Sequence, residues 1–363
     1  MLNTTYRLLI SVFFLIVFLS ACSTSAILPS NEPESTPEPR HVKVFFHTDR
    51  APDRDADAYF SGERGDLYYG ITRVGIPANH LMGHHEEPSL LKFEWSPDEH
   101  KHIKVTDLNM KTKDDFILEL SEAVNDSPGK KLMVFIHGYN VKFSEAAKVV
   151  AQFTNDLKFA GPVVLFSWPS QGTLTGYSTD ETNAQWSTAH FVDFMKTLLE
   201  EVPAKDIYLV AHSMGNRVLG NGFNKLASDL PKSYLALFRE IVMIAPDIDA
   251  DVFRQDMAPR LARTGIHTTL YASSNDRALK ASKAFHGYAR AGDSGEGVVV
   301  VDGVETIDVS DASGGLLGHS YFAEDRRIME DIFSLLQTGQ RADGRFGLGP
   351  VELDGSKYWT FRK

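Results

Sequence analysis

The chain has 363 residues, of which 43% are hydrophobic and 23% charged, proportions that fit a folded globular protein and argue against a polytopic membrane protein. Its formal net charge of −11 repels polyanions, which argues against nucleic acid as a partner. The single cysteine excludes an intramolecular disulfide framework and a multi-thiolate zinc site.

The N-terminus has the layout of an export signal. A cation at Arg7 precedes an apolar run over residues 8–19, and Ser20-Ala21-Cys22 follows. Residues 19–22 resemble the bacterial lipobox, which implies that residues 1–21 are a signal peptide and that Cys22 receives lipid. Ser23 resembles a signal for sorting to the outer membrane. The expected location is therefore the bacterial cell envelope, with the membrane as a partner through Cys22. An uncleaved anchor and a soluble secreted form are the alternatives.

Residues 22–40 are rich in Ser, Pro and Glu and have no apolar periodicity, which predicts an extended tether. A single folded domain is expected over residues 41–363. Its first part, residues 41–128, contains strand-like segments at 42–46 and 68–76 and is predicted to form a β-rich extension that flanks a main sheet.

Residues 129–338 alternate apolar strands with amphipathic helices and form the expected catalytic core, which leaves 339–363 as a C-terminal tail. Strands are predicted at 132–136, 163–167, 207–211, 241–245, 268–272 and 304–309, and helices at 144–159, 186–201, 216–227, 252–262 and 324–336. This alternation predicts an α/β fold with a mostly parallel sheet covered by helices on both faces. Ligands bind at the carboxyl ends of the strands in such sheets.

A candidate nucleophile lies where one of these strands meets a helix. The segment Ala211-His212-Ser213-Met214-Gly215 matches the nucleophile elbow G-x-S-x-G, except that alanine replaces the first glycine. Small residues are needed beside the serine because the turn is tight. Ser213 is therefore the predicted nucleophile of a serine hydrolase, and an ordinary strand-to-helix turn is the alternative.

A serine hydroxyl needs a base, and in this fold the partners follow in the order Ser, acid, His. His319 lies between the last strand and the last helix of the core, where a loop can bring it over the serine. His267 precedes a strand, which places it at the wrong edge of the sheet, and His286 lies within or just after a helix. His319 is therefore the predicted base.

The candidate acid is Asp276, which ends the turn after the strand at 268–272. Asp247, which follows the preceding strand, is the alternative acid. Either aspartate could instead cap a helix N-terminus. The oxyanion would be bound by the backbone N–H groups of Met214, directly after the serine, and of Tyr139, in the loop that follows the strand at 132–136.

Several motifs together resemble the bacterial α/β-hydrolase family of unknown function that is grouped with the esterase and lipase superfamily. They are His137-Gly138, Phe166-Ser167-Trp168-Pro169-Ser170, Ala211-His212-Ser213-Met214-Gly215-Asn216-Arg217, Ala245-Pro246-Asp247 and Gly318-His319-Ser320-Tyr321, with Thr48-Asp49-Arg50 and Tyr69-Gly70 in the opening segment. The resemblance runs from about residue 42 to 336. It implies an α/β-hydrolase fold and a catalytic triad, but no particular substrate.

The expected function is hydrolysis of carboxylic esters through an acyl-enzyme, without a cofactor. Acyl transfer by the same triad and a catalytically silent envelope binding protein are the alternatives. A polar loop over residues 171–185 is expected to rim the pocket, which favours small or soluble esters over triglycerides. Two acidic or histidine-rich segments, at 247–251 and 84–87, lack the spacing of a metal site, so no metal is expected.

Overall fold

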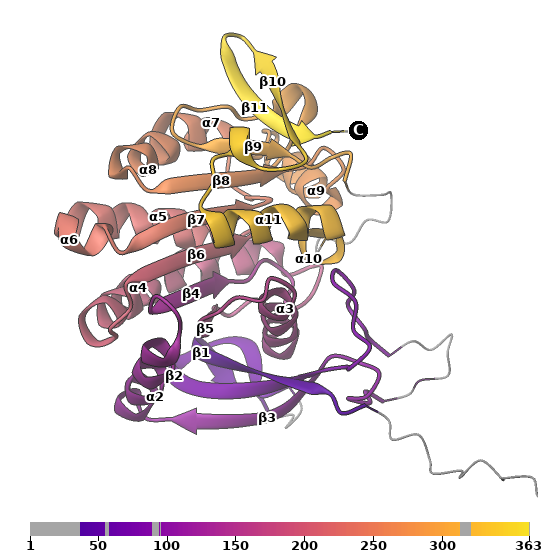
Figure 1. Cartoon of the computed structure of the whole chain (residues 1–363), viewed down its shortest axis with the longest axis vertical. Coiled ribbons are helices and arrows are strands. Elements are labelled where there is room, and N and C mark those ends of the chain that lie inside the picture. Colours follow the sequence, from indigo (N-terminus) through magenta and orange to yellow (C-terminus); the bar gives the residue numbers. More distant parts are fainter. Residues whose placement is uncertain (1–36, 55–57, 89–93, 95, 313–320, 363) are drawn as a thin grey trace, which may run out of the picture. The chain divides into compact units, whose positions relative to one another are not determined.

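The computed structural model describes residues 37–54, 58–88, 94, 96–312 and 321–362, and residues 38–363 form one unit. Within the described residues, eleven strands form one mixed sheet, which runs from β3 at the lower edge of Figure 1 to β10 at the upper edge. In spatial order the strands are β10 (Leu348–Leu353), β11 (Ser356–Phe361), β9 (Glu305–Asp308), β8 (His267–Ala272), β7 (Phe238–Ile244), β6 (Asp206–His212), β4 (Lys131–Ile136), β5 (Val163–Ser167), β1 (Arg40–Pro52), β2 (Phe60–Ile76) and β3 (Lys104–Lys111).

The centre of the sheet is parallel because each strand returns through a helical crossover. Strands β9, β8, β7, β6, β4, β5 and β1 pair in parallel, as predicted for the core. The helices are α2 (Lys113–Asp126), α3 (Phe143–Asp156), α4 (Tyr177–Glu201), α5 (Gly215–Asp229), α6 (Lys232–Leu235), α7 (Ala250–Val252), α8 (Ala258–Thr264), α9 (Arg277–His286), α10 (Tyr321–Glu324) and α11 (Arg326–Thr338). The predicted α/β-hydrolase architecture is confirmed.

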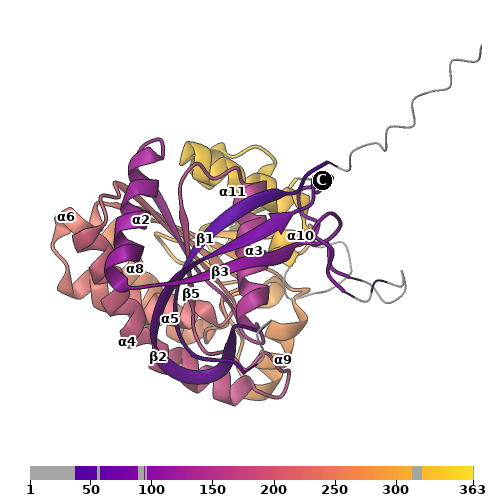
Figure 2. The ribbon, with the colours of Figure 1, turned by 90° about the horizontal axis from the view of Figure 1, so that it is seen from below.

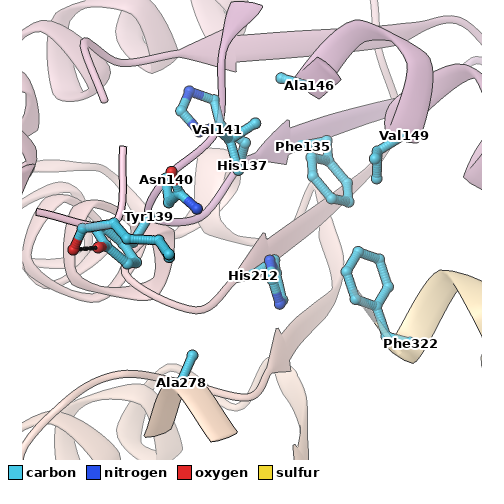
Figure 3. A pocket seen from close by; sticks show the side chains of 11 residues that line it. Phe135, His137, Tyr139, Asn140, Val141, Ala146, Val149, His212, Ala278 and Phe322 are labelled. Atoms are coloured by element: carbon cyan, nitrogen blue, oxygen red, sulfur yellow. Dashed lines mark hydrogen bonds between the residues drawn. The ribbon is translucent and has the colours of Figure 1, made fainter. Parts of the chain in front are cut away.

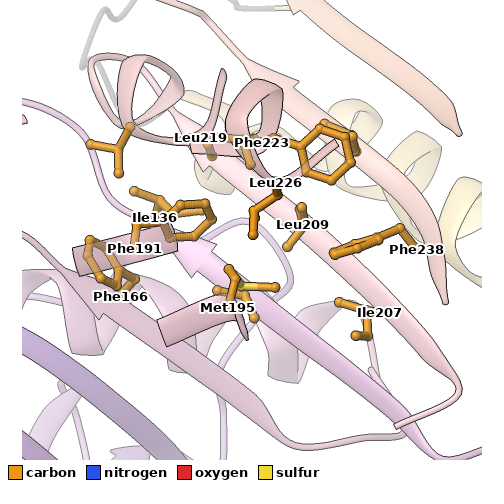
Figure 4. Packing of buried hydrophobic residues seen from close by; sticks show 14 of the residues in the cluster. Ile136, Phe166, Phe191, Met195, Ile207, Leu209, Leu219, Phe223, Leu226 and Phe238 are labelled. Atoms are coloured by element: carbon orange, nitrogen blue, oxygen red, sulfur yellow. The ribbon is translucent and has the colours of Figure 1, made fainter. Parts of the chain in front are cut away.

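Two hydrophobic cores fill the two faces of the sheet. Successive side chains of a strand point to opposite faces, so Leu132 and Val134 of β4 enter one core while Met133 and Phe135 enter the other. Helices α2, α4, α5 and α8 pack on the first face, and α3, α10 and α11 pack on the second. Figure 4 shows the first core between α4, α5 and strands β4 to β7, and Figure 2 shows α2 and α3 on opposite sides of the sheet.

The N-terminal extension is continuous with the main sheet. Strand β1 pairs in parallel with β5 and antiparallel with β2, and β2 pairs antiparallel with β3. The predicted β-rich extension is therefore an antiparallel meander of β1, β2 and β3, which adds three strands to one edge.

The C-terminal segment differs from the tail that the sequence predicts. Residues 339–363 contain the antiparallel hairpin β10–β11, and β11 pairs in parallel with β9. Leu348, Trp359 and Phe361 are buried in the second core, which explains why this segment packs on the sheet. Within the described residues, no helix is both long enough and apolar enough to cross a membrane.

Candidate active site

Ser213 lies in a strained turn at the carboxyl end of β6. Its φ is +53°, a left-handed conformation that costs a non-glycine residue about 1–3 kcal/mol and is found mostly where function requires it. The turn connects β6 directly to α5, and the Ser213 N–H donates to the carbonyl of Ile244 on β7 (2.9 Å). The Asn216 side chain donates to the carbonyls of Ala211 and Ser213, which stabilises the turn. This geometry is that of a nucleophile elbow.

Two glycines let the backbone after β4 approach this turn closely. A Cβ on Gly138 would lie 2.9 Å from the Ser213 Cβ, and a Cβ on Gly215 would lie 2.3 Å from the carbonyl oxygen of His137. Real Cβ atoms do not approach other atoms so closely, so neither position accepts a side chain without movement. Because Ile136 pairs with Ala211, the loop after β4 lies beside the serine turn. We call residues 137–141, which contain the predicted oxyanion donor Tyr139, the oxyanion loop.

A buried arginine from β1 fixes the oxyanion loop. Arg50 is fully buried, and burial lowers its pKa to about 10, which leaves it protonated at neutral pH. Its guanidinium donates to two residues of the loop, Val141 O (2.8 Å) and His137 Nε2 (3.2 Å). It also donates to Ser167 Oγ at the end of β5 (2.9 Å), to Ser170 O after β5 (2.9 Å) and to Ser61 O on β2 (3.1 Å). Such charge-assisted hydrogen bonds are about twice as strong as neutral ones.

His137, the first residue of the oxyanion loop, is neutral. Burial and the nearby guanidinium of Arg50 hold the pKa of His137 well below its usual value. Because a guanidinium can only donate, the His137 Nε2 accepts from Arg50, and Nδ1 carries the proton and donates to the carbonyl of Gly138 (2.8 Å). The ring also stacks on Trp168, with centroids 5.0 Å apart. His137 is thus a structural member of the loop.

An aspartate of α4 holds the other end of the loop. Asp180 is fully buried, and its Oδ2 accepts from the Asn140 N–H (3.2 Å) and from Ser170 Oγ (2.5 Å), while its Oδ1 accepts from the Gln171 N–H (2.7 Å). Burial raises the pKa of this carboxyl group. Asn140 itself has a φ of +58°. Asp180 therefore stabilises a strained residue directly after Tyr139.

The two candidate acids have different surroundings. Asp276 is buried after β8 and caps α9, since its Oδ1 accepts from the N–H groups of Ala278 (2.9 Å) and Leu279 (3.0 Å). Asp276 therefore does cap a helix, as the alternative interpretation of the sequence allowed, and both capping hydrogen bonds are made by Oδ1.

Asp247, after β7, is not a helix cap, because Asp249 caps α7 instead. The Asp247 carboxylate accepts from Ser282 Oγ (2.6 Å) and from the Tyr177 hydroxyl (2.5 Å), and it lies 3.1 Å from Nε of Arg290. Burial and the neighbouring Asp247 raise the pKa of Tyr177, which keeps this hydroxyl protonated as a donor. Both oxygens of Asp247 are thus committed to a structural network.

A cavity of about 260 Å³ adjoins the serine turn. Figure 3 shows His212, which precedes Ser213, and Ala278, two residues after Asp276, on its wall. Its lining is mainly apolar and includes Phe135, Tyr139, Val141, Val149 and Phe322. The carboxyl ends of β4 and β6 and the start of α9 therefore border one partly open cavity.

Two other predicted positions, His319 and Cys22, lie outside the described residues. His267 is the first residue of β8 and His286 is the last of α9, as the sequence predicts, so neither follows a strand end. Local sequence patterns did not indicate Arg50 or Asp180 as site residues. Thr48-Asp49-Arg50 was a family-like motif without an assigned role, and Asp180 lies in the segment predicted as a loop.

That segment is helical for most of its length. Helix α4 begins at Tyr177, and Asp180, Asn183 and Ala184 are buried within it. The prediction of a polar loop over residues 171–185 is therefore wrong beyond Gly176. The apolar periodicity that predicts a helix is weak at the start of α4, because buried positions there are held by polar side chains such as Asp180 and Asn183.

Comparison with known proteins agrees with this geometry. Residues 112–338 match the model of a family described as alpha/beta hydrolase of unknown function (DUF900). The chain belongs to this family. Membership supports hydrolase-type activity and leaves the substrate open, because the family itself has no assigned function.

More distant relatives were also found. An uncharacterized protein, alr1448, from a Nostoc species is 26% identical, with 27% of this chain and 32% of that protein covered, so the chain spans about a third of its length. Solved structures with a similar fold include the lin2722 product of Listeria innocua (14% identity, TM-score 0.35, 58% of this chain and 94% of that one). A carboxylesterase of Bacillus subtilis is also similar (11% identity, TM-score 0.34, 60% and 85% covered).

Proposed function

We propose that the protein is a serine hydrolase that cleaves carboxylic esters through an acyl-enzyme. The carrying observation is the left-handed turn at Ser213, which lies at the carboxyl edge of the sheet beside the oxyanion loop and an apolar cavity. A buried serine in a left-handed turn beside a cavity is an arrangement that clusters at functional sites.

In this mechanism Ser213 Oγ bonds to the ester carbonyl carbon while His319 takes the hydroxyl proton. The backbone N–H groups of Tyr139 and Met214 bind the resulting oxyanion, and Asp276 stabilises the imidazolium. Collapse breaks the ester bond, and the departing alcohol takes the proton from His319. Water then repeats the sequence on the acyl-enzyme, which releases the acid and restores Ser213. The chemistry requires no cofactor. In the alternative function, acyl transfer, the acyl-enzyme forms by the same steps, and an acceptor other than water then takes the acyl group.

Labelling with a fluorophosphonate tests this proposal, because the probe reacts with activated serines. We expect the folded wild-type protein to be labelled on Ser213, as located by mass spectrometry, and Ser213→Ala to lose all labelling. Ser228→Ala is the matched control, since Ser228 lies on the same helix, α5, and only bonds the Asn224 carbonyl. Absence of labelling in folded wild-type protein would instead favour the catalytically silent scaffold.

We further propose that the enzyme acts at the bacterial envelope, anchored by lipid on Cys22. The support is the lipobox-like segment that ends at the single cysteine of the chain. Cys22→Ser is expected to move the protein from membrane to soluble fractions or to leave it as an unprocessed precursor. Fractionation with intact-mass measurement checks this. A variant of normal mature mass that stays in the membrane would contradict lipidation.

A further inference from the structure

An open groove along α9 adjoins the cavity beside Ser213. The groove has a volume of about 460 Å³ and shares Tyr139, Leu174 and Ala278 with the cavity. On the α9 side it is lined by Ala281 and Phe285. The groove therefore borders the cavity beside the serine turn.

Large apolar side chains are exposed on both sides of this groove. Leu174 is 80% exposed before α4, and Phe285 is 66% exposed on α9. Single exposed apolar residues are common, but two that face one groove form a patch of the kind that binds ligands. The rings of Tyr139, Tyr177 and Phe285 follow one another along it, with neighbouring centroids 5.1 and 5.5 Å apart.

The hydroxyl groups of the groove are bonded to the protein and turned away from a ligand. The Tyr139 hydroxyl donates to the carbonyl of Leu174 (2.5 Å, dashed in Figure 3), and the Tyr177 hydroxyl donates to Asp247 (2.5 Å). Ser282 Oγ likewise bonds Asp247 (2.6 Å). Apart from the exposed Arg277 near the start of α9, the groove presents mainly ring faces and methyl groups, which suit a hydrocarbon chain better than a sugar or another polyol.

Volume assigns the two spaces different parts of a substrate. Ligand pockets usually measure about 300–1,000 Å³. The cavity beside Ser213, at 260 Å³, falls below that range, while the groove, at 460 Å³, falls within it. The cavity by itself suits only the reacting ester group and a short substituent. A longer substituent must leave through the groove.

We propose that the groove binds the aliphatic chain of the substrate, so that the substrates are esters with a medium-length or longer hydrocarbon chain. This inference rests on the proposed function and revises the expectation of small or soluble esters. Each methylene that becomes buried can raise kcat/KM up to about fourfold.

The test compares p-nitrophenyl acetate with p-nitrophenyl octanoate, and ethyl acetate with octyl acetate, so that a chain on either side of the ester is covered. We expect the wild-type enzyme to prefer the ester with the eight-carbon chain in at least one pair, by tenfold or more in kcat/KM. Ala281→Trp, which fills the groove from an exposed helix position, should abolish that preference. Ala284→Trp, also exposed on α9 but outside the groove, should retain it.

The outcomes separate this inference from the proposed function. Cleavage of the acetates without any chain preference, or a preference that survives Ala281→Trp, would overturn the groove and leave the esterase intact. A wild-type protein that cleaves none of these esters and is not labelled by fluorophosphonate would overturn both.

Discussion

Asp276→Asn is expected to lower kcat by a factor on the order of 10⁴ with little change in KM, because the triad acid acts on the imidazolium that forms during attack. The structure makes this substitution unusually clean. Asp276 caps α9 through Oδ1, and asparagine caps helices about as well as aspartate, so stability should change little. Steady-state kinetics together with urea unfolding of the same variant measure both quantities.

Asp247→Asn is the matched comparison. Asp247 accepts from Tyr177 and Ser282 beside the Arg290 guanidinium, so removal of its charge should reduce the free energy of unfolding while the folded fraction keeps most of its turnover. An inactive, folded Asp247→Asn together with a fully active Asp276→Asn would move the acid one strand earlier and leave Ser213 and His319 in their roles.

Arg50→Met is expected to damage both stability and turnover. Each buried acceptor left without a donor costs about 1–3 kcal/mol, and the substitution leaves the Val141 and Ser170 carbonyls in that state. The oxyanion loop would lose its anchor on β1, and a misplaced oxyanion donor lowers kcat by about 10²–10³. Urea unfolding and kinetics at a temperature where the variant is folded separate the two effects.

Arg50→Lys retains the charge with fewer donors and should recover part of kcat. Arg260→Met, which removes an exposed arginine paired only with Asp256, should behave as wild type. Wild-type kcat in the folded Arg50→Met protein would show that Arg50 supports the fold alone and does not position the loop.

The core strands could be predicted because each is a short, continuous apolar run buried on both faces, as β4 and β6 show. The turn at Ser213 could be predicted because its small neighbours are close to it in sequence. A helix near His286 was expected from the sequence, but its limits were not given, and α9 buries only Leu279 and Ser282. The C-terminal hairpin was missed although it has a local signal, the turn at Asp354 and Gly355 with positive φ at both residues. Only its pairing with β9 depends on residues far apart in the chain.

The residues that fix the oxyanion loop could not be found from local patterns for the same reason. Arg50 precedes its partner His137 by 87 positions, and Asp180 follows Asn140 by 40. A charged residue after an apolar strand has many possible uses, and only the pairing of β1 with β5 brings Arg50 beneath the loop.

The position of β1 between β5 and β2 also determines how short a segment of this chain could be transferred into another protein and still fold. The segment that the family model matches, 112–338, contains the serine turn but excludes β1 and Arg50. A gene fragment cut at those limits would encode β5 as a bare sheet edge, with a row of unpaired N–H and C=O groups open to association with other chains. The smallest portable module is therefore longer than the matched segment and begins at β1.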